Sequence, residues 1–221
     1  MIANGHDVAV MGHHVSDNLE NTYSNARANY YGVQYIPDAY FDGVLNILGG
    51  SNYSAYLAKV NQRLAIPSNF SLSINGFNDG LDYTVAVAVD NVETYAGTNI
   101  VLQFVVTESN VWEGGTKYNF VTRYMDPNQN GTPLDFSGNS SQTILLEFTL
   151  NGSWVTDNCE FVAFVQDNDT KEVLQGTKVA VPDLMPMYFN NASTQAINMV
   201  PVLNCAGEVA PRVTIANEGA D

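Results

Sequence analysis

Apolar positions follow two different periods along the chain, and the change comes near residue 66. In residues 18–30 and 53–64 apolar side chains recur every three or four positions, which predicts amphipathic helices. From residue 69 onward apolar and polar positions alternate, for example in residues 83–89, which predicts strands with one buried face. The chain is therefore expected to join a short helix-containing part to a longer β-rich part.

The first 66 residues predict the order strand, helix, strand, strand, helix. Residues 8–11 form an uninterrupted apolar run, as in a strand that is covered on both faces. Asp17 or Asn18 can cap the helix that follows. Gly32 can adopt the positive φ that is common at helix C-termini, so the helix is expected to end there.

A short hairpin is predicted after this helix. Strands at residues 39–41 and 44–48 flank Asp42-Gly43, which is a strong turn signal. The residue before a proline is driven out of the α region, so residues 33–36 are expected to run extended into Pro37. Trans is the default form of such a bond.

Seven strands with turn signals between them are predicted in residues 67–181. They lie at residues 70–74, 83–89, 100–106, 118–124, 143–150, 159–165 and 173–179. This number and spacing favour an immunoglobulin-like antiparallel β-sandwich. Residues 182–221 are predicted to be a connector followed by the start of a further β-domain or a donated strand, so the predicted domains are 1–66, 67–181 and 182–221.

The composition is that of an acidic globular protein. Hydrophobic residues make up 45% of the chain, and 23 acidic against 8 basic residues give a net charge of −15. Nucleic acids and anionic membrane surfaces need clusters of Lys and Arg, so both are excluded as partners. No run of eighteen apolar residues occurs, so no transmembrane segment is predicted. Residues 1–7 lack the pattern of a signal peptide, and we interpret the chain as an internal fragment of an exported protein.

One loop has the ligand pattern of a calcium site. Asp126, Asn128 and Asn130 lie at alternate positions, as oxygen ligands do in calcium loops. Position twelve is Ser137 instead of an acid, which excludes an EF-hand, and Asp135 is the acid that can replace it. Asn and Gly are also the usual formers of polar hairpin turns, so both interpretations stay open.

Two adjacent histidines, His13 and His14, form a second candidate metal pair. Neighbouring residues of a strand point to opposite faces, so the two cannot easily hold one ion together. We interpret them as one packed and one exposed imidazole.

The two cysteines, Cys159 and Cys205, do not form a Cys-x-x-Cys motif. Thiol-disulfide exchange at such a motif needs a paired thiolate of low pKa, which this chain does not supply. In an exported protein Cys159 and Cys205 can form a disulfide. Otherwise Cys159 is a buried small apolar residue, and the spacing alone leaves both alternatives open.

Several segments resemble one protein family. They are Val8-Ala9-Val10, His14-Val15-Ser16-Asp17, Asn25-Ala26-Arg27, Tyr30-Tyr31-Gly32-Val33 and Ile36-Pro37-Asp38-Ala39-Tyr40-Phe41-Asp42-Gly43, and then residues 118–123, 154, 161–166 and 170–175. Together they resemble exported thioredoxin-like proteins of Bacteroidetes, which are similar to the outer-membrane lipoprotein family named for a twenty-eight-kilodalton founding member. The resemblance covers roughly residues 1–180.

The resemblance implies a mixed fold, in which a partial thioredoxin-like α/β unit precedes an immunoglobulin-like antiparallel β-sandwich. It also implies that the peptide bond before Pro37 is cis and that this proline is the structural cis-proline of the thioredoxin fold. In that family a Cys-x-x-Cys-Pro segment lies upstream of the stretch that matches residues 7–10. That segment is missing here, so redox activity is not carried over.

We therefore expect a non-enzymatic exported protein of the cell surface or extracellular space, which acts in adhesion or assembly. The expected partner is a protein, including further copies of this chain, joined in a ring or filament by the strand at residues 212–216. The alternative is a fragment of a thiol-disulfide oxidoreductase whose Cys-x-x-Cys lies upstream of Met1. Calcium is the one cofactor that the sequence suggests.

Overall fold

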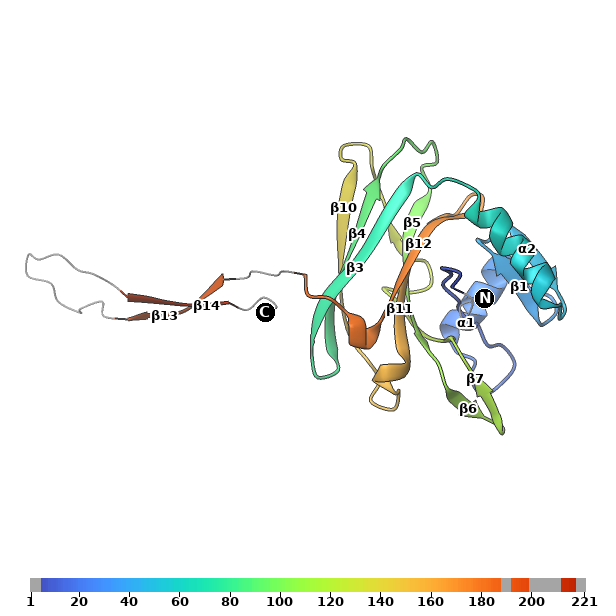
Figure 1. Cartoon of the computed structure of the whole chain (residues 1–221), viewed down its shortest axis with the longest axis horizontal. Helices are drawn as coiled ribbons and strands as arrows, with labels where there is room; N and C mark the ends of the chain where they lie inside the picture. The colour runs from blue at the N-terminus through green and yellow to red at the C-terminus, as the bar shows by residue number, and fades with distance from the viewer. Residues whose placement is uncertain (1–4, 188–191, 199–211, 218–221) are drawn as a thin grey trace, which may run out of the picture. The chain divides into compact units, whose positions relative to one another are not determined.

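The computed structural model of this chain describes residues 5–187, 192–198 and 212–217 (Figure 1). The fold is β-rich, with antiparallel sheets and two α-helices in these ranges. The chain divides into two compact units, Met1–Leu184 and Met185–Asp221. Neither α-helix of the described ranges is long and apolar enough to cross a lipid bilayer.

The N-terminal elements are two helices on either side of a hairpin. They are α1 (Thr22–Tyr31), β1 (Asp38–Phe41), β2 (Leu45–Leu48) and α2 (Tyr53–Leu64). The bounds predicted for the second helix are confirmed. The predicted turn is also present, because Asp42 and Gly43 both have positive φ, 47° and 76°, and send the chain back as β2.

Helix α1 begins later than predicted. Its N-cap is Asn21, whose side chain accepts a hydrogen bond from the Ser24 N–H (2.9 Å), and neither Asp17 nor Asn18 has this role. An N-cap residue needs an extended backbone directly before the first turn, and Asn21 provides it. Gly32 ends the helix with a φ of 72°, as predicted.

The prediction of a strand at residues 8–11 is wrong. Residues 8–11 belong to no strand, and the next residue, Gly12, makes an isolated parallel bridge to Val121 on the edge of the sandwich. Strand β1 pairs with β2 alone in the described part of the chain, so residues 8–11 have no neighbouring strand with which to form a ladder. Val10 is accordingly exposed, although the apolar run predicted cover on both faces.

All seven predicted strands of the β-sandwich are present. One sheet has the order β10-β4-β3, and the other has the order β12-β11-β5-β8 with β9 beside β5 (Figure 1). The strands are β3 (Phe70–Asp79), β4 (Asp82–Asn91), β5 (Ile100–Glu108), β8 (Val121–Asp126), β9 (Thr132–Pro133), β10 (Ser141–Thr149), β11 (Cys159–Asp167) and β12 (Val173–Ala180).

Three short strands were not predicted. They are the hairpin of β6 (Val111–Glu113) and β7 (Thr116–Tyr118), and β9. Each has three residues or fewer, which is too short to display a period of two. Trp112 on β6 is exposed, whereas Trp154 packs against the sandwich core.

The main core fills the space between the two sheets. On β4 every second side chain points inward, so Val85, Val87 and Val89 are fully buried. Strands β5 and β11 are buried at almost every position instead, because their outer face is covered too. A second core forms on that outer face from Val105, Met125, Val162 and Phe164, with Met11, Tyr23 and Val173 packed against it.

The division between the two compact units falls after Leu184, so the N-terminal helices and the strands that follow them belong to one unit. The predicted domains 1–66, 67–181 and 182–221 stay a prediction. In the second unit, β13 (Ala192–Asn198) and β14 (Arg212–Asn217) pair as an antiparallel hairpin. The strand that was expected to join further copies of the chain thus has a partner strand within the described part of its own chain.

We expect Gly43→Ala to lower the free energy of unfolding by about 2–3 kcal/mol more than Gly49→Ala does. The two glycines have nearly the same φ, 76° and 78°, so the conformational strain is shared. A Cβ atom at Gly43 would collide with the Lys171 carbonyl oxygen, whereas nothing lies within 4 Å of one at Gly49. Urea denaturation of both variants measures the difference, and equal losses would contradict this packing.

Candidate functional site

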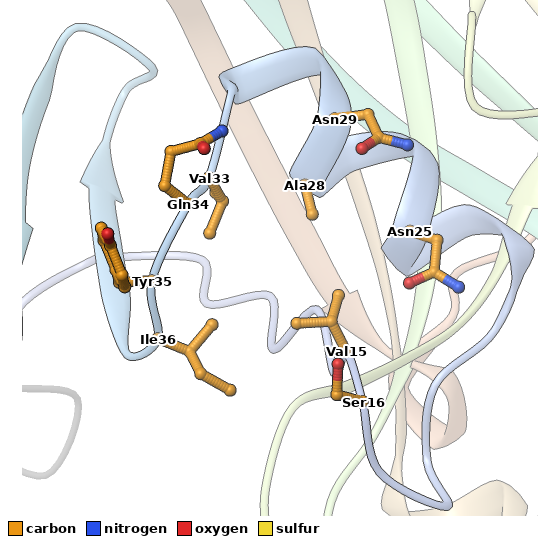
Figure 2. Close-up of a pocket in the computed structure, with 9 residues that line it drawn as sticks. All are labelled: Val15, Ser16, Asn25, Ala28, Asn29, Val33, Gln34, Tyr35 and Ile36. Carbon is orange, nitrogen blue, oxygen red and sulfur yellow. The ribbon is translucent and has the colours of Figure 1, made fainter.

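An open groove of about 530 Å³ lies beside α1 (Figure 2). Three segments form it: the chain just before the turn that leads into α1, the helix itself, and the extended loop that follows. The lining residues are Val15, Ser16, Asn25, Ala28, Asn29, Val33, Gln34, Tyr35 and Ile36.

One wall of the groove is a face of α1 that the sandwich leaves free. Ser24 and Arg27 of this helix are buried. Helical geometry then directs Asn25 and Asn29 to another side, where they line the groove together with Ala28 at its edge. This wall is therefore fixed in position, because the buried side of α1 packs against the sandwich.

The other wall is the loop between α1 and β1. The Val33 N–H donates to the Ala28 carbonyl (2.9 Å), which holds the start of the loop against the helix. Tyr35 is 73% exposed and Ile36 is 62% exposed, so both present apolar surface to solvent. The peptide bond between Ile36 and Pro37 is cis, as the resemblance implied.

The side chains that line the groove are uncharged. None of its lining residues is an Asp, Glu, His, Lys, Arg or Cys, so the lining supplies neither a thiolate nor an acid–base pair. Its side-chain amides can both donate to and accept from peptide groups, and its apolar side chains can cover those of a ligand. Such a lining suits an uncharged stretch of polypeptide.

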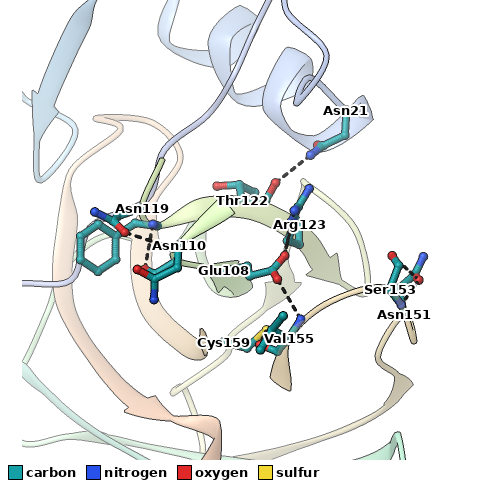
Figure 3. A network of polar contacts seen from close by, with 12 residues as sticks. Asn21, Glu108, Asn110, Asn119, Thr122, Arg123, Asn151, Ser153, Val155 and Cys159 are labelled. Atoms are coloured by element: carbon teal, nitrogen blue, oxygen red, sulfur yellow. Dashed lines mark hydrogen bonds and ion pairs between the residues drawn. The ribbon is translucent and has the colours of Figure 1, made fainter. Parts of the chain in front are cut away.

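Cys159 does not line this groove and lies in the buried network of Figure 3. Its thiol is free, and its Sγ is 3.5 Å from the Val155 carbonyl oxygen. Burial, with the nearby Glu108 carboxylate adding to it, raises the pKa of Cys159 to about 12. The buried, apolar position of Cys159 agrees with one of the two alternatives. Cys205 lies outside the described residues, so its pairing with Cys159 stays a prediction.

The same network is held together by one ion pair. The Glu108 carboxylate accepts from the Arg123 guanidinium (2.8 Å) and from the Val155 N–H (2.8 Å). These bonds attach the loop before β11 to strands β5 and β8. The network is therefore structural, and it encloses the thiol instead of activating it.

The side chains of the predicted calcium loop are bonded to nearby groups. Asp126 accepts from a neighbouring tyrosine hydroxyl (3.1 Å), and burial raises its pKa. Asn128 and Asp135 each accept from the main-chain N–H two residues further on (2.9 Å). These are the bonds of a polar turn, the second interpretation, and within the described ranges no three His, Cys, Asp or Glu converge on one point. Calcium binding stays a prediction.

The two histidines have different surroundings. His14 Nδ1 is 2.7 Å from a carboxylate oxygen of Asp17, and its ring meets the edge of Tyr118. His13 Nδ1 is buried without a hydrogen-bond partner. Burial lowers the pKa of His13 to about 3, with the charge of Arg27 adding to the effect. Within the described part of the chain, the two imidazoles share no hydrogen-bond partner.

Sequence reasoning missed the buried junction that anchors α1. Arg27 Nη2 donates to the Tyr31 hydroxyl (2.9 Å) and to Gln166 Oε1 (2.8 Å). Gln166 Nε2 donates in turn to the Tyr31 hydroxyl and to the Lys171 carbonyl (2.8 Å each). The guanidinium also lies 4.6 Å from the centre of the Tyr30 ring. Arg and Gln are mostly exposed in proteins, so the sequence signal for this junction is weak: Gln166 directly follows the apolar residues 161–165.

Comparison with known proteins gives a likeness in fold. No protein-family model and no curated protein matches the chain. The structure is similar to HBP35 of Porphyromonas gingivalis, with a TM-score of 0.65 and 14% identity over 89% of this chain and 67% of that chain. A domain of the outer membrane lipoprotein Omp28 from the same organism aligns with a TM-score of 0.41 and 19% identity, over 56% of this chain and 94% of that chain.

We expect Cys159 to be almost inert in the folded protein. Raising the pKa from 9.0 to about 12 lowers the thiolate fraction at pH 8 about a thousandfold, and burial adds to the protection. A Cys205→Ser variant isolates this thiol, and Ser153→Cys, added on an exposed loop nearby, is the reactive reference. Labelling with an aromatic disulfide reagent follows both, and comparable rates would contradict the assignment.

We expect the stability of the fold to decrease as the pH falls below about 6.5. The folded protein keeps His13 neutral to about pH 3, whereas the unfolded chain binds a proton near pH 6.5. One proton taken up only on unfolding gives a slope of about 1.4 kcal/mol per pH unit. Denaturation between pH 7 and 5 should lose this slope in His13→Leu and keep it in the control His6→Gln. An unchanged slope in His13→Leu would show that another group causes the pH dependence.

Proposed function

We propose that this chain is a non-enzymatic exported protein of the cell surface or extracellular space, which acts in adhesion or assembly by holding a polypeptide in the groove beside α1. It is proposed to belong with the thioredoxin-like outer-membrane proteins of Bacteroidetes that its sequence resembles. The observation that carries the proposal is the groove itself, about 530 Å³ in volume and lined by apolar and uncharged polar side chains alone.

The arrangement of the elements supports this family assignment. Helix, hairpin and helix in residues 22–64 are the elements of a partial thioredoxin-like unit. The sheet orders β10-β4-β3 and β12-β11-β5-β8 support an immunoglobulin-like sandwich. Such a sandwich packs a three-stranded sheet against a four-stranded sheet. The likeness to a Porphyromonas gingivalis protein over most of the chain agrees with both.

The chemistry of the side chains supports a binding role over catalysis. Cys159 is buried and has a raised pKa, which is the opposite of a reactive thiol. The alternative, a fragment of a thiol-disulfide oxidoreductase, gains no support from this residue. A net charge of −15 favours solubility outside the cell and disfavours nucleic acids as partners.

The test is direct binding of a polypeptide to the groove. The probe is a fluorescein-labelled peptide of alternating valine and threonine, whose apolar and polar groups match the lining. We expect saturable binding in fluorescence anisotropy, and at least a fivefold loss of affinity in Ile36→Ser and in Tyr35→Ser. Both residues are exposed, so the substitutions should leave the fold intact.

Leu145→Ser is the matched control for Ile36→Ser. Leu145 has the same exposed fraction, 62%, but lies on β10, away from the groove. We expect this variant to bind the peptide as the unchanged chain does. Absence of saturable binding, or equal losses in Leu145→Ser and Ile36→Ser, would overturn the proposal.

A further inference from the structure

A second cavity, of about 140 Å³, lies between α1, β5 and the loops next to them. All of the side chains that line it are polar. They are Arg27, Tyr30, Gln103, Gln129, Asn130 and Asn168. Engineered cavities of about 150 Å³ admit a molecule the size of benzene, so the space suffices for a small organic ligand. The lining selects a polar one.

Arg27 brings a positive charge to this cavity. The residue is only 2% exposed, and none of the ion pairs in the described part of the chain involves it. Its hydrogen-bond acceptors, Tyr31 and Gln166, are neutral. Buried charges in proteins are usually paired, so a guanidinium with neutral partners beside an open space favours an anion there.

Gln103 supplies an unsatisfied acceptor in the same lining. It is 1% exposed, and its Nε2 donates to the Gln129 carbonyl (3.3 Å). Its Oε1 is buried and has no hydrogen-bond partner. Buried polar atoms nearly always have a partner, so this oxygen has acceptor capacity left for a donor that binds next to it.

We propose that this cavity binds a small carboxylate that also carries a hydrogen-bond donor, of the 2-hydroxy-acid class. The carboxylate pairs with the Arg27 guanidinium, and the hydroxyl donates to Gln103 Oε1. Neither group alone satisfies both residues, so the two observations together define the ligand class. The site is independent of the groove on the other side of α1.

The predicted calcium loop has a different role at such a site. Gln129 and Asn130 of that loop line the cavity together with Arg27. A divalent cation held by Asn130 would lie close to the guanidinium, and like charges repel. The polar tip of the loop thus forms the rim of a carboxylate site.

The test is a titration of the whole chain, followed by amide chemical shifts at constant ionic strength. The probes are glycolate, acetate and chloride. We expect saturable shifts at residues 129–130 with millimolar glycolate, acetate binding at least fivefold more weakly because it lacks the hydroxyl, and no saturation with chloride.

Two variants and a control variant separate the contributions. Asn130→Asp adds a negative charge at an exposed rim position, and we expect glycolate affinity to fall at least tenfold. Asn139→Asp adds the same charge on another exposed loop and should change nothing. Gln103→Met removes the acceptor at similar size, and should reduce glycolate affinity to that of acetate while leaving acetate unchanged.

Other outcomes would overturn the proposal. If no probe gives saturable shifts up to 50 mM, the cavity holds water alone. If Asn139→Asp weakens glycolate as much as Asn130→Asp does, the effect is general charge repulsion. If calcium shifts residues 129–130 and glycolate does not, the loop is a cation site. Since the groove is probed with a peptide, the two proposals can fail separately.

Discussion

The need to cover both faces of the five-stranded sheet governs the architecture. Strands β5 and β11 carry apolar side chains on their inner and outer faces, and the smaller sheet can cover only the inner one. Helix α1 and the segment before it cover the other. Arg27 and Gln166 fix that contact, because both would be costly to bury without each other. The N-terminal elements and the sandwich consequently form one compact unit.

The position of α1 sets both proposed binding regions. One side of the helix carries Arg27 to the smaller cavity, and another carries Asn25 and Asn29 to the groove. A single anchored helix thus contributes a charged side chain to one space and uncharged side chains to the other.

The sequence predicted those elements whose pattern is local. Helix α2 and seven strands were predicted because their apolar positions repeat over many residues, and the Asp42-Gly43 turn because its residue types are distinctive. The prediction of a strand at residues 8–11 was wrong because a strand needs a neighbouring strand, which the apolar pattern of one segment cannot reveal. Arg27 and Gln103 were missed for a related reason: their burial depends on contacts with residues roughly 140 and 26 positions away along the chain.

The contact that anchors α1 also depends on a positive charge that is held by neutral groups. Its buried cation is held by a hydroxyl, an amide and aromatic rings, so no carboxylate partner is lost when dissolved ions screen charges. A molecule with a net charge of −15 also repels itself less strongly as the concentration of ions increases. Molar salt, which weakens surface ion pairs, should therefore leave the contact between α1 and the sheet intact and reduce the repulsion among the acidic residues of the chain.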